Sequence, residues 1–389
     1  MSIVSNKNLI YLDHCATTPV DPEVVVAMLP FFTDRFGNAS SIHAFGQEAK
    51  VALEDARRQV AGLIGAEPAE IAFTSGGTEA DNWAVKGTAY FYEGRKRHIV
   101  TSAVEHHAVL YTCKYLEKRG FEVTYVPVDP YGMVAPDKVE EALREETFLV
   151  SVMHANNELG TINPIGEIGA RVRERGILFH TDAVQTFGKI PIDVAGLNVD
   201  LLSLSGHKIY GPKGIGALYI RKGLKIEKFL HGGKHERDRR AGTENVPAAV
   251  GLGKAAAICQ QRLETDLGRL RDLSEALYTR IAQAVPGVHL NGHPTRRVPG
   301  IVNLSFDGVQ SESLLMSLDL EGIAVSNGSA CTSGSVEPSH VLKALKLSKN
   351  LADSAIRLSL GRGNTEEEVD VTVAALKTIV ERLRGFNSR

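Results

Sequence analysis

Short apolar segments alternate with amphipathic helical segments from residue 71 to residue 220. Polar or glycine-rich turns separate the two kinds of segment, as expected for strands and helices that follow one another. This alternation predicts an α/β domain with a largely parallel sheet, because a crossover helix returns the chain to the same edge of the sheet. Ligands of such sheets bind beyond the carboxyl ends of the strands. The alternation therefore predicts both a fold class and the edge at which a functional site should lie.

Chemically versatile side chains follow several of these strands. Residues 76–78 place backbone N–H groups and a hydroxyl at a helix N-terminus, which favours a phosphate, although an ordinary turn fits this stretch equally well. Asp182 follows a buried strand and is either a structural cap or the partner of a protonated ring nitrogen. His106 is a capping or surface residue unless a planar cofactor lies at the same edge. The residues that converge on strand ends are Gly76, Gly77, Thr78, His106, Asn157, Asp182, Gln185 and Lys208.

Residues 200–220 place a lysine in an unusual setting. An apolar strand ends at Gly206, His207 and Lys208 follow, and a glycine-rich turn leads into a second apolar strand. A lysine here either extends from the sheet edge into solvent or forms a Schiff base with an aldehyde cofactor. Ser203, Ser205 and His207 surround it with hydrogen-bonding groups. Together with the other strand-end residues, this setting favours the Schiff base.

The composition argues against several classes of protein. The formal net charge of −2 does not suit a dedicated nucleic-acid binder. No apolar run approaches the roughly 20 residues of a membrane span, and the first residues lack the apolar core of a signal peptide. The four cysteines lie far apart without a CxxC pair, so we expect neither a disulfide framework nor a metal site. This usage indicates a reducing compartment, and we expect a cytoplasmic location.

A chain of 389 residues is expected to form two domains. Helical periodicity runs from about residue 248 to residue 285, and we expect the boundary near residue 260, at or inside the start of this helix. Beyond it, the pattern predicts a strand at 298–306, a helix at 311–320 and a last amphipathic helix that opens near Asn364.

Two residues of the C-terminal part suggest chemistry. Cys331 lies among small polar residues in a glycine-flanked loop, which favours a reactive thiol over a buried, inert one. Arg357 lies inside an otherwise apolar strand, where it binds either a ligand carboxylate or a carboxylate of the protein itself.

Taken together, these motifs resemble cysteine desulfurases of the NifS/IscS type, which are fold-type I pyridoxal-phosphate enzymes of the class-V aminotransferase group. The resemblance covers almost the whole chain, and the combination of motifs is specific. It rests on residues 74–79, 105–106, 155–158, 180–185, 205–208, 239–245 and 328–334.

The resemblance implies a large α/β domain at residues 16–260, with a mainly parallel sheet of the seven-stranded type that binds the cofactor. A smaller α+β domain would combine residues 1–15 with 261–389 and carry the cysteine loop at about 326–338. The resemblance also implies a homodimer.

The resemblance assigns roles to single residues. Lys208 would hold pyridoxal 5'-phosphate as a Schiff base, Asp182 would pair with the ring nitrogen, and His106 would stack on the ring and move protons. Gln185 and Asn157 would approach the phenolic oxygen, and Arg357, with Asn157, would bind the substrate carboxylate. The residues that would hold the phosphate are Gly77, Thr78, Ser205, His207 and, from a second subunit, Thr243.

The implied reaction takes sulfur from L-cysteine and releases L-alanine, leaving a persulfide on Cys331. An iron–sulfur scaffold or another acceptor protein would then receive the sulfur, and Cys331 could ligate a nascent iron–sulfur cluster during transfer. Cys15 and Asn327 depart from the residues expected at their positions. A related lyase, an aminotransferase, an idle scaffold protein and nucleic-acid binding through the basic segment 221–240 remain alternatives.

Overall fold

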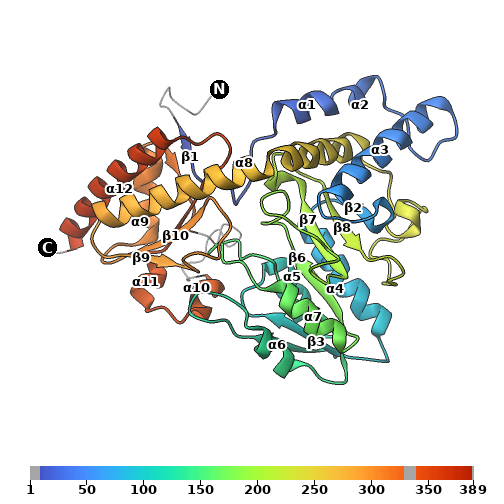
Figure 1. Cartoon of the computed structure of the whole chain (residues 1–389), viewed down its shortest axis with the longest axis horizontal. Helices are drawn as coiled ribbons and strands as arrows, with labels where there is room; N and C mark the ends of the chain where they lie inside the picture. Colours follow the sequence, from blue (N-terminus) through green and yellow to red (C-terminus); the bar gives the residue numbers. More distant parts are fainter. Residues whose placement is uncertain (1–8, 328–338, 388–389) are drawn as a thin grey trace.

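Figure 1 shows a computed structural model of the protein, which describes residues 9–327 and 339–387. A large lobe is built on a seven-stranded sheet, and a C-terminal lobe is built on a three-stranded sheet. One long helix, α8 (Val246–Ala284), runs from the first lobe to the second (Figure 1).

The large sheet has the strand order β2-β8-β7-β6-β5-β3-β4. Four neighbouring pairs are parallel, and β8 is antiparallel to both β2 and β7. β8 reverses direction because the turn before it is too short for a crossover between parallel strands. The predicted, mainly parallel seven-stranded sheet is therefore confirmed. Its strands are β2 (Ile71–Thr74), β3 (His98–Ser102), β4 (Glu122–Val126), β5 (Thr147–Ser151), β6 (Leu178–Asp182), β7 (Leu201–Ser205) and β8 (Gly216–Ile220).

The helices of the large lobe begin where the sequence provides caps. The Asp21 side chain accepts a hydrogen bond from Glu23 N at 2.9 Å, and Pro22 starts the first helix. The third helix starts at Ala44, because the His43 side chain caps it. These helices are α1 (Pro22–Met28), α2 (Pro30–Thr33), α3 (Ala44–Gly62), α4 (Gly77–Tyr92), α5 (His107–Glu117), α6 (Pro136–Ala142) and α7 (Ile165–Glu174).

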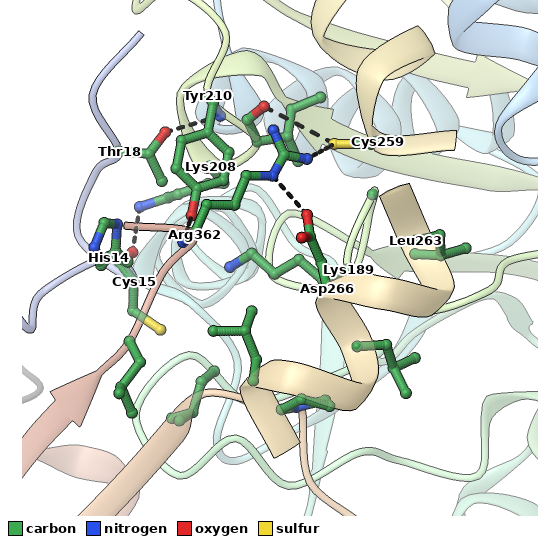
Figure 2. A pocket seen from close by; sticks show the side chains of 17 residues that line it. His14, Cys15, Thr18, Lys189, Lys208, Tyr210, Cys259, Leu263, Asp266 and Arg362 are labelled. Atoms are coloured by element: carbon green, nitrogen blue, oxygen red, sulfur yellow. Dashed lines mark hydrogen bonds and ion pairs between the residues drawn. The ribbon is translucent and has the colours of Figure 1, made fainter. Parts of the chain in front are cut away.

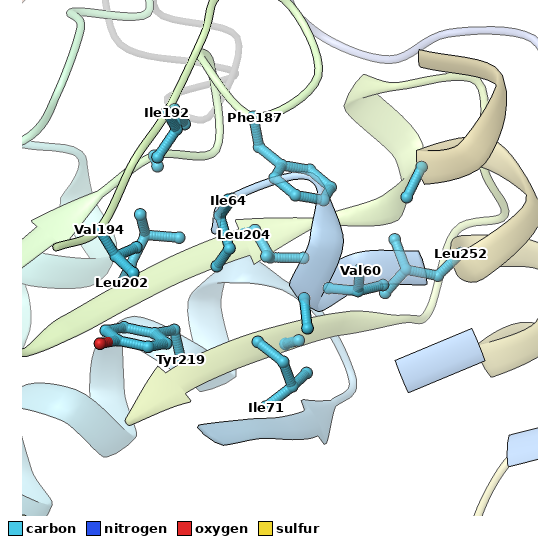
Figure 3. Close-up of a cluster of buried hydrophobic side chains, with 14 of the residues drawn as sticks. Val60, Ile64, Ile71, Phe187, Ile192, Val194, Leu202, Leu204, Tyr219 and Leu252 are labelled. Carbon is cyan, nitrogen blue, oxygen red and sulfur yellow. The ribbon is translucent and has the colours of Figure 1, made fainter. Parts of the chain in front are cut away.

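A large apolar cluster packs one face of this sheet against α3 and α8 (Figure 3). Val60 from α3, Leu202 from β7 and Leu252 from α8 are fully buried there. Each such side chain stabilises the fold by about 1.5–3 kcal/mol. The packing holds the strand ends in a fixed register.

The C-terminal lobe has the antiparallel strand order β12-β10-β9. Strand β10 begins at Ile301 instead of the predicted Val298, because Pro299 lacks an N–H and Gly300 turns the chain with φ +91°. The elements are β9 (Val288–Asn291), β10 (Ile301–Phe306), α9 (Ser311–Leu320), β11 (Ile323–Ala324), α10 (His340–Ala344), α11 (Lys349–Asp353), β12 (Ile356–Ser359) and α12 (Glu366–Asn387).

The start of the described chain lies on the C-terminal lobe. Strand β1 (Ile10–Tyr11) pairs in parallel with β11, and Ile10 and Leu12 belong to the apolar cluster of that lobe. Helix α8 contributes Leu252 to one cluster and Leu277 to the other. The predicted domain boundary near residue 260 thus falls inside a continuous helix, and the exact division stays a prediction.

Candidate active site

A cavity of about 280 Å³ lies at the carboxyl ends of the parallel strands, between the two lobes. It brings together ten residues that the sequence singled out, namely Gly77, Thr78, His106, Asn157, Asp182, Gln185, Ser205, His207, Lys208 and Arg357. Six further residues line it: Cys15, Ala16, Asp81, Met153, Ala155 and Val184.

Lys208 reaches the cavity from a single 3₁₀ turn, η2 (Gly206–Lys208), directly after β7. Its Nζ donates hydrogen bonds to the carbonyl oxygens of Cys15 and Ala16, both at 2.6 Å. The amine is therefore held at the cavity by the N-terminal segment.

Asp182 ends strand β6 and is buried, with its Oδ1 accepting a hydrogen bond from Val184 N at 2.8 Å. Burial raises its pKa to about 6, although that hydrogen bond and the charge of Lys208 act in the opposite direction. Burial and the charge of Asp182 also raise the pKa of Asp81. A cationic group in the cavity would favour the ionised carboxylate, which suits a protonated ring nitrogen.

His106 is the N-cap of helix α5, as the capping interpretation proposed, and it also lines the cavity. Its Nδ1 accepts a hydrogen bond from Ala108 N at 3.1 Å, so the neutral ring carries its proton on Nε2. Burial lowers its pKa to about 4, with help from the charges of His107, Lys208 and His340. The ring is therefore neutral at pH 7 and can stack on a planar group.

The first turn of helix α4 forms one end of the cavity. Gly76 precedes it, and no side chain of the described residues caps its N–H groups. A Cβ on Gly77 would lie 2.7 Å from Val184 Cγ2, so only glycine fits there without displacement. These N–H groups, with the Thr78 and Ser205 hydroxyls, fit a phosphate.

His207 lies beside this phosphate-sized region. Its Nδ1 forms a hydrogen bond of 3.1 Å with Thr17 Oγ1. Burial, together with the charges of three lysines, lowers its pKa to about 4. It therefore offers a neutral hydrogen-bonding ring.

Gln185 and Asn157 approach the cavity from two loops. The Gln185 Nε2 donates to the Cys15 carbonyl oxygen at 3.0 Å, and its Oε1 accepts from Lys189 Nζ at 3.0 Å. The backbone oxygen of Asn157 accepts a hydrogen bond from Arg357 Nη1 at 2.8 Å.

Arg357 combines both interpretations that its sequence allowed. Its Nη2 lies 2.7 Å from Asp13 Oδ1, so it forms an ion pair within the protein. It also lines the cavity, and its buried Nε has no hydrogen-bond partner among the described residues. A ligand carboxylate could therefore still bind the guanidinium.

One predicted residue, Thr243, does not line the cavity. Thr243 is exposed in the loop between η3 (Glu236–Asp238) and α8. Cys331 lies outside the described residues. The three described cysteines are buried free thiols, and burial raises the pKa of both Cys113 and Cys259.

Sequence reasoning missed Asp81 and the N-terminal segment. Asp81 follows Gly77 by four residues in one helix, so helical spacing could have placed it beside the phosphate region. The role of Cys15 and Ala16 depends on long-range packing, for which the local sequence carries no signal.

The comparison with known families agrees with this geometry. The family described as Aminotransferase class-V matches residues 10–371. The chain belongs to the class-V aminotransferase family. The resemblance to desulfurases of the NifS/IscS type is also confirmed, since two similar proteins are named cysteine desulfurase IscS. "Cysteine desulfurase IscS" of Methanosarcina thermophila is 54% identical over 99% of this chain and 95% of its own length. The protein of the same name from Dictyoglomus turgidum is 51% identical over 98% of this chain and 97% of its own length.

Solved structures show the same class-V fold. A "NIFS-LIKE PROTEIN" superposes with a TM-score of 0.91 and 41% identity, covering 96% of this chain and all of its own. "SspA in complex with cysteine" gives a TM-score of 0.80 and 39% identity, covering 90% of this chain and 98% of its own.

The residues that the structure describes also bear on membranes and metals. None of their helices has both the length and the apolar character needed to cross a bilayer. Within the same ranges, no three or more His, Cys, Asp or Glu side chains are grouped in a way that could hold a metal ion.

Proposed function

We propose that this protein is a pyridoxal-phosphate-dependent cysteine desulfurase, which takes sulfur from L-cysteine, releases L-alanine and leaves a persulfide on Cys331. The observation that carries the proposal is a single cavity that combines a lysine amine, a buried carboxylate and an uncapped helix N-terminus. The names of the most similar relatives support the same activity.

The residues present fit pyridoxal 5'-phosphate. Lys208 Nζ would bind the aldehyde carbon, Asp182 would pair with the ring nitrogen, and the N–H groups at Gly77 and Thr78 would hold the phosphate with Ser205 and His207. Two features support this placement: no side chain of the described residues caps the helix end, and there is no room for a Cβ atom at Gly77. When bound, this cofactor withdraws electrons from the α-carbon of an amino acid.

The side chains of this chain would divide the remaining work. Arg357 would orient the substrate carboxylate, and the free amine of Lys208 would accept the α-proton. His106 would stack on the cofactor and could donate the proton on Nε2. The thiolate of Cys331 would attack the substrate sulfur, forming an S–S bond while the C–S bond breaks. The electron pair of that bond stays on the carbon fragment, which takes up a proton and leaves as alanine.

We also propose a homodimer, in which Thr243 of one subunit completes the phosphate site of the other. The exposed position of Thr243 is compatible with this arrangement. Large apolar side chains are exposed along α1 to α3, with Ile42 93% accessible and Phe36 66% accessible, and such a patch is typical of a protein interface. A cytoplasmic location and an iron–sulfur scaffold or other acceptor protein as partner complete the proposal.

The proposal is tested by a single turnover of the cofactor-loaded protein with L-cysteine. We expect one alanine per active site and an added sulfur on Cys331, measured by amino-acid analysis and peptide mass spectrometry. Cys331→Ser should bind the cofactor and L-cysteine but release little alanine. Cys113→Ala, a change of a buried thiol away from the cavity, is the control and should react normally.

Three results would contradict the proposal. One is sulfur on a cysteine other than Cys331, and another is normal alanine release by Cys331→Ser. The third is amino-group transfer to an added keto acid in place of sulfur transfer, which would identify an aminotransferase.

A further inference from the structure

The structure has a second, smaller cavity of about 40 Å³, whose lining residues are drawn in Figure 2. Cys15 and Lys208 line both cavities. Lys189 and Arg362 give this second cavity two cationic side chains, and Asp266 pairs with Arg362 at 2.6 Å. Lys189 has no such carboxylate partner among the described residues.

Lys189 instead contacts a residue of the active-site cavity. Its Nζ donates a hydrogen bond to Gln185 Oε1 at 3.0 Å. The turn that allows this contact includes Gly188, which has φ +70°, and a Cβ there would lie 2.9 Å from Cys259 Sγ. The ammonium is thus built into the wall between the two cavities.

This contact fixes the orientation of the Gln185 amide. An ammonium can only donate hydrogen bonds, so the carbonyl end of the amide must face Lys189. The NH₂ end then faces the opposite way, where Nε2 donates to the Cys15 carbonyl oxygen at 3.0 Å. Rotating the amide by half a turn would set its NH₂ group against the ammonium and its oxygen against a carbonyl oxygen.

We propose that Lys189 is a positioning residue, which holds the Gln185 amide so that its NH₂ group points at the phenolic oxygen of the cofactor. This inference rests on the proposed function and on the contact with the phenolic oxygen that the resemblance implies for Gln185. A donor stabilises the ionised phenolic oxygen, and the positive charge of the half-buried Lys189 adds to this effect. Without Lys189 only the Cys15 carbonyl oxygen orients the amide, so the amide presents its oxygen more often, which disfavours the ionised form.

The test uses the full-length, cofactor-loaded protein and follows its visible absorption band as a function of pH. In Lys189→Met we expect the midpoint of that titration to rise by about one pH unit, which is a tenfold change in the proton equilibrium. Lys189→Arg keeps a head group that only donates, so it should restore most of the wild-type midpoint. Lys254→Met, which removes an exposed lysine paired with Glu23, is the matched control and should titrate like the wild type.

A double-mutant cycle separates positioning from a general loss of stability. In a Gln185→Leu background, Lys189→Met should cause little further shift, because the amide that it orients is absent. Equal shifts in both backgrounds, or an unchanged midpoint in Lys189→Met, would overturn the inference. If Lys189→Met does not fold, Lys189→Gln replaces it, since its amide can either donate or accept. A wild-type protein that never develops a visible band with pyridoxal phosphate would instead refute the proposed function.

Discussion

The active-site cavity has two walls that are built in different ways. The strand-end wall consists of residues at the ends of β2, β6 and β7 or a few positions beyond them, such as Gly77, Asp182 and Lys208. The N-terminal wall consists of Cys15, Ala16 and Arg357, with Asp13 behind it as the partner of Arg357, and its contacts join positions far apart in the chain. Arg357 and Asp13, which form an ion pair, lie 344 residues apart. Local sequence patterns therefore determine the first wall, and long-range packing determines the second.

The largest effect is expected from breaking the strand-end wall at Lys208. Lys208→Ala removes the amine that would bind the cofactor and accept the α-proton, so alanine release should fall by about 10³-fold or more. Lys213→Ala, an exposed lysine on the same glycine-rich turn, should remain active. Borohydride reduction followed by peptide mapping should place the label on Lys208, and a label on another lysine would refute the assignment.

A smaller effect is expected from changing Arg357 in the N-terminal wall. Arg357→Ala should weaken L-cysteine binding by about 2–5 kcal/mol, as is typical for truncating one member of a buried charged pair. The cofactor should stay attached, because its contacts lie on the strand-end wall. Steady-state kinetics measure the effect as a rise in KM, and Arg144→Ala, on the surface, is the control. An unchanged KM would remove Arg357 from the site.

Asp13→Asn tests the N-terminal wall alone. It leaves the buried guanidinium of Arg357 without its carboxylate partner, so we expect the free energy of unfolding to fall by about 1–3 kcal/mol. Urea unfolding measures the loss, and Asp34→Asn, an exposed aspartate, serves as the control. Equal stability of the two variants would show that the ion pair contributes nothing.

The smallest effect concerns pH and a buried carboxyl behind the strand-end wall. Burial raises the pKa of Glu105 from its ordinary 4.5 to about 8, against hydrogen bonds from Ser102 and Met153. The folded state therefore keeps a proton that the unfolded chain has released, and its stability falls as pH rises between these two values. Glu105→Gln should lose that part of the pH dependence in the cofactor-free protein.

We expect this pH-dependent difference to reach about 1–2 kcal/mol, because relaxation and water penetration offset much of the burial cost. Urea unfolding at pH 5 and pH 8 measures it. Glu122→Gln, which changes an exposed side chain, should show the same dependence of stability on pH as the wild type. If the stability of Glu105→Gln changed with pH in the same way as that of the wild type, Glu105 would already be ionised at pH 5 in the folded protein.

The contrast between the walls also explains what the sequence could predict. The strand–helix alternation predicted the sheet, and the strand ends predicted Asp182 and Lys208, because a parallel sheet gathers such positions at one edge. The same reasoning could not find the Cys15 carbonyl oxygen, because any residue supplies a carbonyl and only packing decides where it points. For Arg357 the sequence left two partners open, since a guanidinium suits a ligand and a protein carboxylate equally well.

Helix α8 has a mechanical consequence for the two walls. Its N-terminal half is packed tightly against α1 and α3, since a Cβ on Gly253 would lie 2.6 Å from Ala56 Cα. The 24 residues from 261 to 284 extend about 36 Å beyond this anchored half. A bend of about 5°, within the gentle curvature of long helices, would move the far end by about 3 Å. A flexure of this size would change the separation of Arg357 from Lys208 while both cores stay intact.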